Sequence, residues 1–319
     1  MKRLLTACVA ALVAARLAAP VAARAHAQAI YGGDDRIDVY QTGNAQLRSL
    51  ADSTVALFHS DDVATQGDEA RLRTRIYGDS MQMCPQEPFF DQPVGAVCSG
   101  SLVAPDVIMT AGHCVLAADK CKDVKFVFGF AIKEKGQDAT KIPAGDVYGC
   151  KEIIGGEQDY DGADWALVRL DRRVAGHAPL KLNLSGKIDK GAPVFAIGHP
   201  VGLPTKIAGG ARVRDASNPA VFVANLDTYV HNSGSAVFSA ETNLVEGILV
   251  RGARDFAFDP VGQCQFSIRC EDGDCQGEDV TRIAKVADTI PAAEHAARAV
   301  QLEPRIVAIL AALEAGAHP

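Results

Sequence analysis

Short apolar segments separated by polar turns run through the middle of this 319-residue chain, and they constrain its fold more than any other feature. They lie at 53–58, 94–97, 101–110, 124–131, 165–170, 193–197, 220–223, 236–239 and 245–250. The 29 Gly and 15 Pro of the chain supply turns between them. Short strands joined by turns are typical of a β-barrel or a β-sandwich, so we expect an all-β protein.

The composition excludes two broad classes of chain. Hydrophobic residues make up 48% and charged residues 22%, which allows a sizeable core and is too little charge for a disordered polyelectrolyte. The formal net charge is −7, whereas proteins that wrap nucleic acid normally carry a basic excess. We therefore expect no nucleic-acid partner.

The N-terminus has the pattern of a secretory signal peptide. Lys2 and Arg3 precede an apolar, alanine-rich run at 4–19, and the small residues that follow end in A-x-A at position 27 or 29. We expect residues 1–27 to be the signal, with cleavage after 29 as the alternative. Removing 1–27 takes away four cations and no acid, so the net charge falls from −7 to −11. No later stretch is apolar and long enough to span a bilayer, and we expect a secreted or periplasmic protein.

Eight of the nine cysteines follow the expected signal peptide. An even number in an oxidising compartment predicts four disulfides. The alternative is a metal site built from Cys264, Cys270 and Cys275, but their spacing is not that of the usual C-x-x-C pairs. We expect no metal and no cofactor.

Two segments carry a histidine and an acid that suit general-base chemistry. The apolar run 101–110 leads into Ala-Gly-His113-Cys114, where a cysteine beside the histidine can anchor the turn. Asp164 comes directly before the apolar run 165–170, so its carboxylate can sit in a protected place and accept an imidazole N–H. Asp159 and Asp161 compete for that role, and we choose Asp164 because the apolar run begins immediately after it.

A third segment, His231-Asn-Ser-Gly-Ser-Ala-Val-Phe, carries the candidate nucleophile. A serine hydroxyl is unreactive at neutral pH unless a base such as His113 takes its proton during attack. Ser233 and Ser235 both offer a hydroxyl, and only Ser233 is followed by glycine.

Together the three segments resemble those of the chymotrypsin-like serine peptidases. T-A-G-H-C matches their histidine segment, D-W-A-L-V their aspartate segment, and N-S-G-S the nucleophile loop of the bacterial glutamyl-endopeptidase branch. The order His, Asp, Ser separates this family from subtilisins and α/β-hydrolases. Segments 198–207, 246–252 and 281–283 extend the resemblance over about 53–290.

The resemblance implies two six-stranded antiparallel β-barrels and a serine endopeptidase. His113, Asp164 and Ser233 would form the triad and act through an acyl-enzyme on protein or peptide substrates. The expected organisation is an N-terminal segment at 28–52, a peptidase domain at 53–290 and a C-terminal helical extension at 291–319, where 291–300 and 304–315 each begin at a proline. We expect a monomer.

Cysteine pairing follows from the same resemblance. The family carries a bridge at the positions of Cys98 and Cys114. We pair Cys121 with Cys150, because both lie between the histidine and aspartate segments. Cys84 should then join one of the three cysteines at 264, 270 and 275, leaving the other two to pair together.

One departure leaves two interpretations open. The resemblance makes the N–H groups of His231 and Ser233 the oxyanion hole, but most relatives have glycine at the position of His231. A non-glycine residue can hold the required backbone angles at a strain of about 1–3 kcal/mol. Loss of one donor lowers turnover by about 10²–10³. The chain is therefore either a working endopeptidase or a weak or inactive homologue that acts as a protein-binding domain.

The resemblance also places the substrate pocket, at Asp227, Thr228, Leu249, Arg251 and Gly252. Glutamyl endopeptidases use a histidine at the position of Leu249, so we expect no preference for glutamate before the cleaved bond. Asp227 stands where trypsin has the acid that selects Lys and Arg, although Arg251 would be able to neutralise it. Thr228 keeps a hydroxyl that would help to bind an acid.

Overall fold

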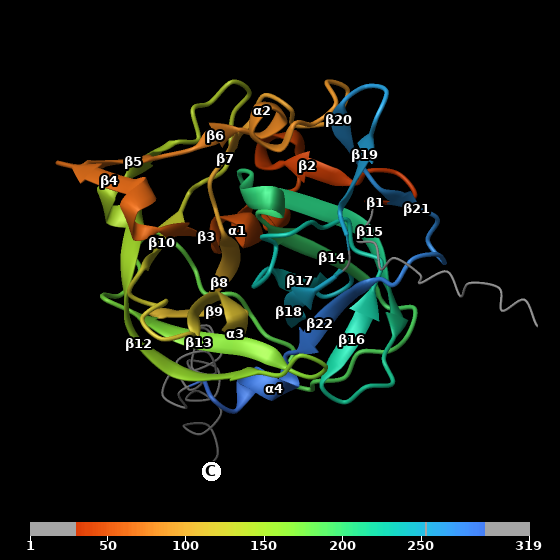
Figure 1. Ribbon diagram of the computed structural model, residues 1–319. Helices are drawn as coiled ribbons and strands as arrows, with labels where there is room; N and C mark the ends of the chain where they lie inside the picture. Colours follow the sequence, from red (N-terminus) through yellow and green to blue (C-terminus); the bar gives the residue numbers. More distant parts are fainter. Residues whose placement is uncertain (1–29, 253, 291–319) are drawn as a thin grey trace, which may run out of the picture.

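The computed structural model describes residues 30–252 and 254–290 (Figure 1). The expected signal peptide at 1–27 and the helices expected at 291–300 and 304–315 lie outside the described residues. The described chain forms two closed antiparallel β-barrels, which confirms the fold class expected from the sequence.

The first barrel is built from the N-terminal half of the chain. Its strands are β3 (Thr54–His59), β8 (Cys98–Ala104), β9 (Val107–Thr110), β10 (Val124–Phe128), β12 (Val147–Gln158) and β13 (Asp164–Leu170). They close in the order β10-β12-β13-β9-β8-β3, with β3 pairing to β10.

The second barrel also has six strands and carries one strand from the N-terminal segment. Its strands are β14 (Pro193–Gly198), β15 (Lys206–Asp215), β16 (Val221–Ala224), β17 (Ala236–Ser239), β18 (Val245–Arg251) and β22 (Glu278–Arg282). They run in the order β14-β17-β18-β22-β16-β15, and the β14–β15 pairing closes the barrel. Strand β2 (Arg36–Asp38) adds to β15 from outside. The N-terminal segment is thus part of the second barrel's sheet.

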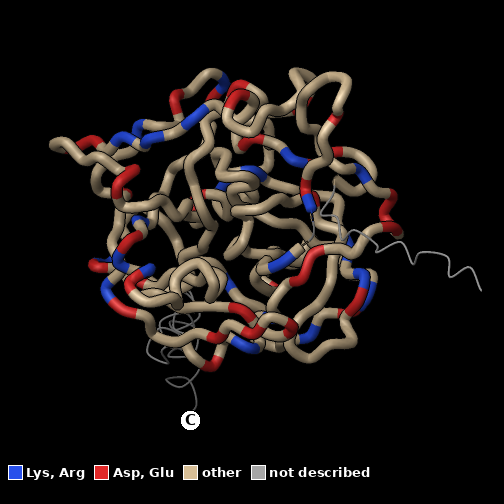
Figure 2. The backbone as a smooth tube through the Cα atoms, in the orientation of Figure 1, with Lys and Arg blue, Asp and Glu red and all other residues tan. Residues whose placement is uncertain are grey.

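Side chains are buried on both faces of the barrel strands. In β3, Val55 and Leu57 pack into the main core, whereas Ala56 and Phe58 pack into a second cluster with Phe130. This explains why the barrel strands read as continuous apolar runs rather than alternating ones. Charged residues lie mostly on outer strands and loops (Figure 2).

Smaller elements decorate the barrels. The other strands are β1 (Ile30–Tyr31), β4 (Val63–Gln66), β5 (Glu69–Leu72), β6 (Arg75–Ile76), β7 (Pro93–Val94), β11 (Lys141–Pro143), β19 (Phe256–Asp259), β20 (Cys264–Ser267) and β21 (Arg269–Cys270). The helices are α1 (Ala45–Asp52), α2 (Tyr77–Met81), α3 (Gly112–Val115) and α4 (Ala284–Ala287), with 3-10 turns η1 (Val39–Gln41), η2 (Ser60–Asp62), η3 (Ala144–Asp146) and η4 (Pro200–Gly202). No helix in the described ranges is long and apolar enough to cross a membrane.

Four disulfides join the eight cysteines that follow the expected signal peptide. Two are the pairs expected from the sequence, Cys98–Cys114 and Cys121–Cys150. The other two, left open by the sequence, are Cys84–Cys264 and Cys270–Cys275. These cysteines are therefore not available as thiolate ligands for a metal.

A buried histidine ties the end of α1 to the first barrel. His177 Nδ1 lies 2.8 Å from Asp52 Oδ2, and its Nε2 lies 3.4 Å from Asp146 Oδ1. The ring stacks on Phe128 with centroids 4.3 Å apart. Burial lowers the pKa of His177, but hydrogen bonds and charge from Asp146 and Asp52 outweigh burial and raise the pKa to about 9.

We predict that His177→Gln destabilises the fold in a pH-dependent way. The folded-state pKa is raised, so the stabilisation is fully present below the unfolded value near 6.5 and is lost as pH rises through about 9. Urea unfolding at pH 6 should show a loss of about 2 kcal/mol that shrinks toward zero above pH 9. The control is His59→Gln, because His59 is exposed and pairs with no acid in the described chain. An equal loss at every pH would contradict the prediction.

Candidate functional site

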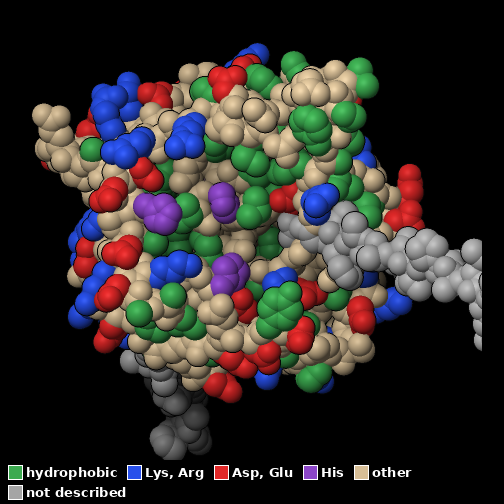
Figure 3. Space-filling model, viewed as in Figure 1, with side chains coloured by type: hydrophobic (Ala, Val, Ile, Leu, Met, Phe, Trp, Pro, Cys, Tyr) green, Lys and Arg blue, Asp and Glu red, His purple; other side chains and the backbone are tan. Residues whose placement is uncertain are grey.

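A cleft of about 640 Å³ lies between the two barrels. The first barrel contributes His113 and Asp164 to its wall, and the second contributes Ser233 and Leu249. In the space-filling view, histidine side chains gather near the middle of this face, where the surface is hollowed (Figure 3). The three segments singled out in the sequence therefore meet at one place.

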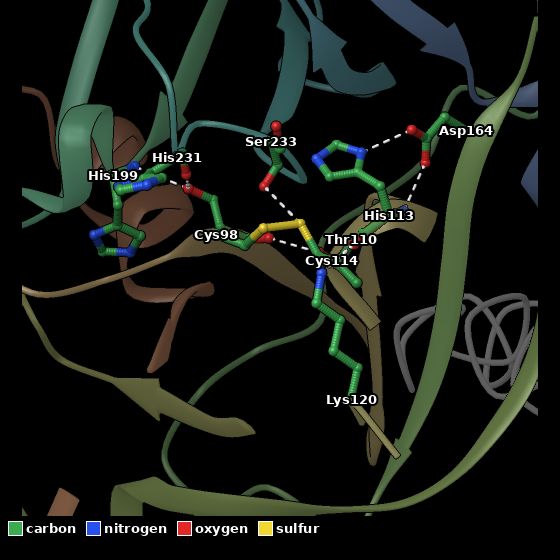
Figure 4. Close-up of a disulfide and its surroundings, with 10 residues drawn as sticks. Cys98, Thr110, His113, Cys114, Lys120, Asp164, His199, His231 and Ser233 are labelled. Atoms are coloured by element: carbon green, nitrogen blue, oxygen red, sulfur yellow. Dashed lines mark hydrogen bonds and ion pairs between the residues drawn. A yellow bond between two sulfur atoms is a disulfide. The ribbon is translucent and has the colours of Figure 1, made fainter. Parts of the chain in front are cut away.

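His113 is presented by the single turn of α3, directly after β9. Its Nδ1 lies 2.7 Å from Asp164 Oδ2, and its backbone N–H donates to Asp164 Oδ1 at 3.1 Å. Gly112 permits this approach, because a Cβ there would lie 2.5 Å from the Glu157 carbonyl oxygen. One carboxylate thus fixes both the ring and the backbone of the histidine, and Nε2 is left facing Ser233 (Figure 4).

Asp164 opens β13 and is only 3% exposed. Its N–H donates to Thr281 Oγ1 at 3.0 Å, and the Thr281 hydroxyl donates back to the Asp164 carbonyl, also at 3.0 Å. The competing acids Asp159 and Asp161 lie on an exposed turn. The carboxylate in contact with the imidazole is that of Asp164.

The two candidate serines differ sharply in their surroundings. Ser233 lines the cleft, whereas Ser235 is fully buried and its hydroxyl donates to Asn232 Oδ1 at 3.2 Å. Between them, Gly234 has φ +94°, and a Cβ there would lie 2.0 Å from the Ser99 carbonyl oxygen. Glycine is therefore required after Ser233. Among the described residues, no hydrogen bond joins Ser233 Oγ to His113 Nε2, a contact that commonly tightens only when substrate binds.

His231 adopts the conformation that a glycine would favour. Its φ is +74°, in the left-handed region that costs a non-glycine residue about 1–2 kcal/mol. In the described part of the chain, neither its N–H nor that of Ser233 has an acceptor. The imidazole is largely buried, which lowers its pKa. Residue 231 thus has the left-handed backbone that glycine would favour, although the residue is histidine.

The expected pocket residues divide into two groups. Leu249, Arg251 and Gly252 line the cleft, whereas Asp227 and Thr228 do not. Arg251 cannot neutralise Asp227 because it is engaged elsewhere. Its guanidinium pairs with Asp279 at 3.2 Å and donates to the backbone carbonyls of Asp159 and Gly162.

Asp227 holds the N-terminal segment instead of forming the base of the pocket. Its carboxylate accepts the N–H of Tyr31 at 2.8 Å and the N–H of Asp35 at 2.9 Å. Burial raises the pKa of Asp227 to about 6, against the lowering effect of these two N–H groups. Asp227, which the sequence placed in the pocket, therefore binds the N-terminal segment instead, where Tyr31 lies 196 residues before it in the chain.

A different acid, missed by the sequence, lines the cleft. Asp255 is buried, and its Oδ2 accepts the Val230 N–H at 2.9 Å. Its Oδ1 has no hydrogen-bond partner among the described residues, and burial raises the pKa of the carboxyl to about 7. The pocket expected from the sequence ends at Gly252, and Asp255 lies three residues later in a turn-rich stretch that carries no recognisable motif.

Comparisons with known proteins place these features in context. Residues 98–248 match the family model of the trypsin-like peptidase domain. The search of curated proteins gave no match. Similar solved structures include the Rv3671c Ser343Ala mutant of M. tuberculosis (13% identity, 84% of this chain and 97% of that chain, TM-score 0.45) and a Glu endopeptidase (15%, 83% and 99%, 0.45). The VesB protease of Vibrio cholerae is also similar (13%, 80% and 67%, 0.45).

We predict that Asp227→Ala loosens the N-terminal segment. The N–H groups of Tyr31 and Asp35 lose their acceptor, so their hydrogen exchange should accelerate, and unfolding should become easier by about 1–3 kcal/mol. Exchange measured by NMR or mass spectrometry tests this, with the exposed Asp68→Ala as control. Unchanged exchange at Tyr31 and Asp35 would show that Asp227 does not hold the segment.

Proposed function

Residues 98–248 match the trypsin-like peptidase domain and the described chain folds as a chymotrypsin-like double barrel, and from these findings we propose that the protein is a secreted serine endopeptidase. Ser233 is the nucleophile, His113 the general base and Asp164 the residue that orients the base. The protein is exported in this proposal, because its four disulfides suit an oxidising compartment. Its substrates are proteins or peptides, and it acts as a monomer without cofactor or metal.

The proposed reaction uses the contacts described above. Asp164 accepts the Nδ1 proton of His113, which leaves the Nε2 lone pair free to take the proton of Ser233. Ser233 Oγ then bonds to the substrate carbonyl carbon, and the N–H groups of His231 and Ser233 stabilise the resulting oxyanion. His113 then gives the proton to the leaving amine. In the second stage water attacks the acyl group with His113 as the base, and His113 returns the proton to Ser233 Oγ as the acyl group leaves.

The observation that carries the proposal is the double contact between Asp164 and His113 opposite an accessible Ser233. The alternative is a weak or inactive homologue that binds proteins, and it rests on the histidine at 231. The left-handed φ of His231 favours the enzyme, because the substitution has not turned the two N–H groups toward other acceptors in the described chain.

Covalent labelling with a fluorophosphonate probe tests this function. We predict that the wild-type protein and Ser235→Ala are labelled, whereas Ser233→Ala is not, because only Ser233 lines the cleft. Asp164→Asn should fold normally and react slower by orders of magnitude, since the histidine loses its orienting carboxylate. Folded wild-type protein that takes no label and cleaves no peptide would favour the protein-binding alternative.

The cleft supports a substrate preference against glutamate before the cleaved bond. Leu249 offers an apolar wall, and the Asp255 carboxylate lies in the same cleft with one oxygen unpartnered among the described residues. Above its pKa of about 7 the Asp255 carboxyl is ionised, and this buried like charge disfavours an acidic side chain. Arg254 also lines the cleft, but it is exposed, so solvent screens its charge more strongly.

We predict that peptides with glutamate at that position are cleaved about tenfold less efficiently than those with glutamine. Asp255→Asn should narrow the gap in kcat/KM, because asparagine removes the charge and keeps an oxygen for the Val230 N–H. Asp259→Asn, outside the cleft, is the matched control. Fastest cleavage after glutamate would prove the preference wrong.

A further inference from the structure

His231 needs an external restraint, because its left-handed backbone is one that a histidine rarely adopts. The conformation of a residue is set by the two peptide planes on either side of it. If both planes are anchored by hydrogen bonds, φ and ψ are fixed whatever the side chain. The question is which groups anchor the two peptides that flank His231.

The peptide before His231 is anchored at its carbonyl, because the Val230 carbonyl accepts the Val201 N–H at 2.7 Å. The peptide preceding that one is also held, since the Val230 N–H donates to Asp255 at 2.9 Å. In a trans peptide the carbonyl and the following N–H point in opposite directions. The bond from Val201 therefore directs the His231 N–H away from Val201.

The peptide after His231 is anchored at both of its polar groups. The Asn232 N–H donates to the Tyr229 carbonyl at 3.0 Å, and the His231 carbonyl is held by one side chain, that of Ser99. Ser99 lies in β8 and is fully buried, and its hydroxyl donates to the His231 carbonyl at 3.0 Å. The His199 N–H donates to the same hydroxyl oxygen at 3.0 Å. Because His199 supplies a proton to the oxygen, the single hydroxyl proton of Ser99 is free to go to His231, and the direction of the bond is fixed.

Ser99 also holds the nucleophile by its backbone. Its N–H donates to the Ser233 carbonyl at 2.8 Å, and its own carbonyl accepts the Thr110 hydroxyl at 2.7 Å. Thr110 ends β9, directly before the turn that carries His113. One buried residue thus contacts His231 through its hydroxyl and Ser233 through its N–H, and it is linked to the histidine turn through Thr110.

We propose that Ser99 is a positioning residue whose hydroxyl clamps His231 in the left-handed conformation and so replaces the glycine that this backbone would otherwise require. The inference rests on the proposed function for its kinetic consequence. Ser99 does not touch the substrate. Its hydroxyl acts through the left-handed backbone of His231, and its own N–H separately holds the Ser233 carbonyl. Its hydroxyl should matter only while residue 231 has a side chain that resists positive φ.

The test is a double-mutant cycle between positions 99 and 231. Ser99→Ala should lower kcat about 10- to 100-fold, short of the 10²–10³ expected for complete loss of one oxyanion donor, and leave KM nearly unchanged. In the His231→Gly background, where glycine adopts positive φ without a clamp, Ser99→Ala should cost less than threefold. A purely structural role for Ser99 predicts the same loss in both backgrounds, and that result would overturn the inference.

Ser101→Ala is the matched control for the cycle. Ser101 lies on the same strand two residues later and is equally buried, but its hydroxyl has no partner in the described chain. Its removal should leave kcat unchanged in both backgrounds. If Ser101→Ala slows the enzyme as much as Ser99→Ala does, packing rather than the clamp explains the effect.

A crystal structure of Ser99→Ala provides a readout that does not depend on activity. We expect φ of His231 to leave the left-handed region in Ser99→Ala and to stay there in Ser101→Ala. A wild-type protein without turnover would refute the proposed function, but the φ angle of His231 in Ser99→Ala would still test the role of Ser99. An unchanged φ of +74° in Ser99→Ala would refute that role.

Discussion

The site depends on the bonds that hold one carboxylate at the junction of the barrels. Asp164 and His113 both belong to the first barrel, but Thr281, which fixes the backbone of Asp164, lies in β22 of the second. The orientation of the histidine is therefore tied to the relative position of the two barrels. A displacement between them would move the carboxylate, the imidazole and Ser233 out of register together.

The sequence predicted the features that a local residue pattern encodes, and it missed the contacts that segments distant in the chain supply. The apolar runs predicted the barrel strands, because buried strands leave a mark in their own residues. The glycine after Ser233 separated it from Ser235, and the structure gives the reason, since Gly234 faces the Ser99 carbonyl at a distance that excludes any Cβ. Asp227 was misplaced because its partners are backbone N–H groups of the N-terminal segment, which no side-chain pattern reveals.

The N-terminal segment supports the cleft from behind. Arg36 is buried, pairs with Asp34 at 2.7 Å and stacks over Tyr229, with its guanidinium carbon 4.1 Å from the ring centroid. Tyr229 in turn lines the cleft. Lys206 pairs with Asp38 at 2.7 Å in the same buried region. Arg36 and Lys206 are thus each paired with an acid of the N-terminal segment, which limits the free-energy cost of removing their charges from water. The family-model match begins at residue 98, so this support comes from outside it.

The Ser99–His231 contact constrains the order in which such a pair can arise by mutation. A serine at 99 is compatible with glycine at 231, since its hydroxyl can bond the same carbonyl whatever side chain follows. A histidine at 231 without that hydroxyl would leave the carbonyl of a strained residue unanchored. On the role proposed for Ser99, a mutational path that gains the serine first keeps residue 231 anchored at each step, whereas the reverse order passes through a histidine whose carbonyl has no anchor. The two positions, 132 residues apart in the chain, would then be inherited as a unit.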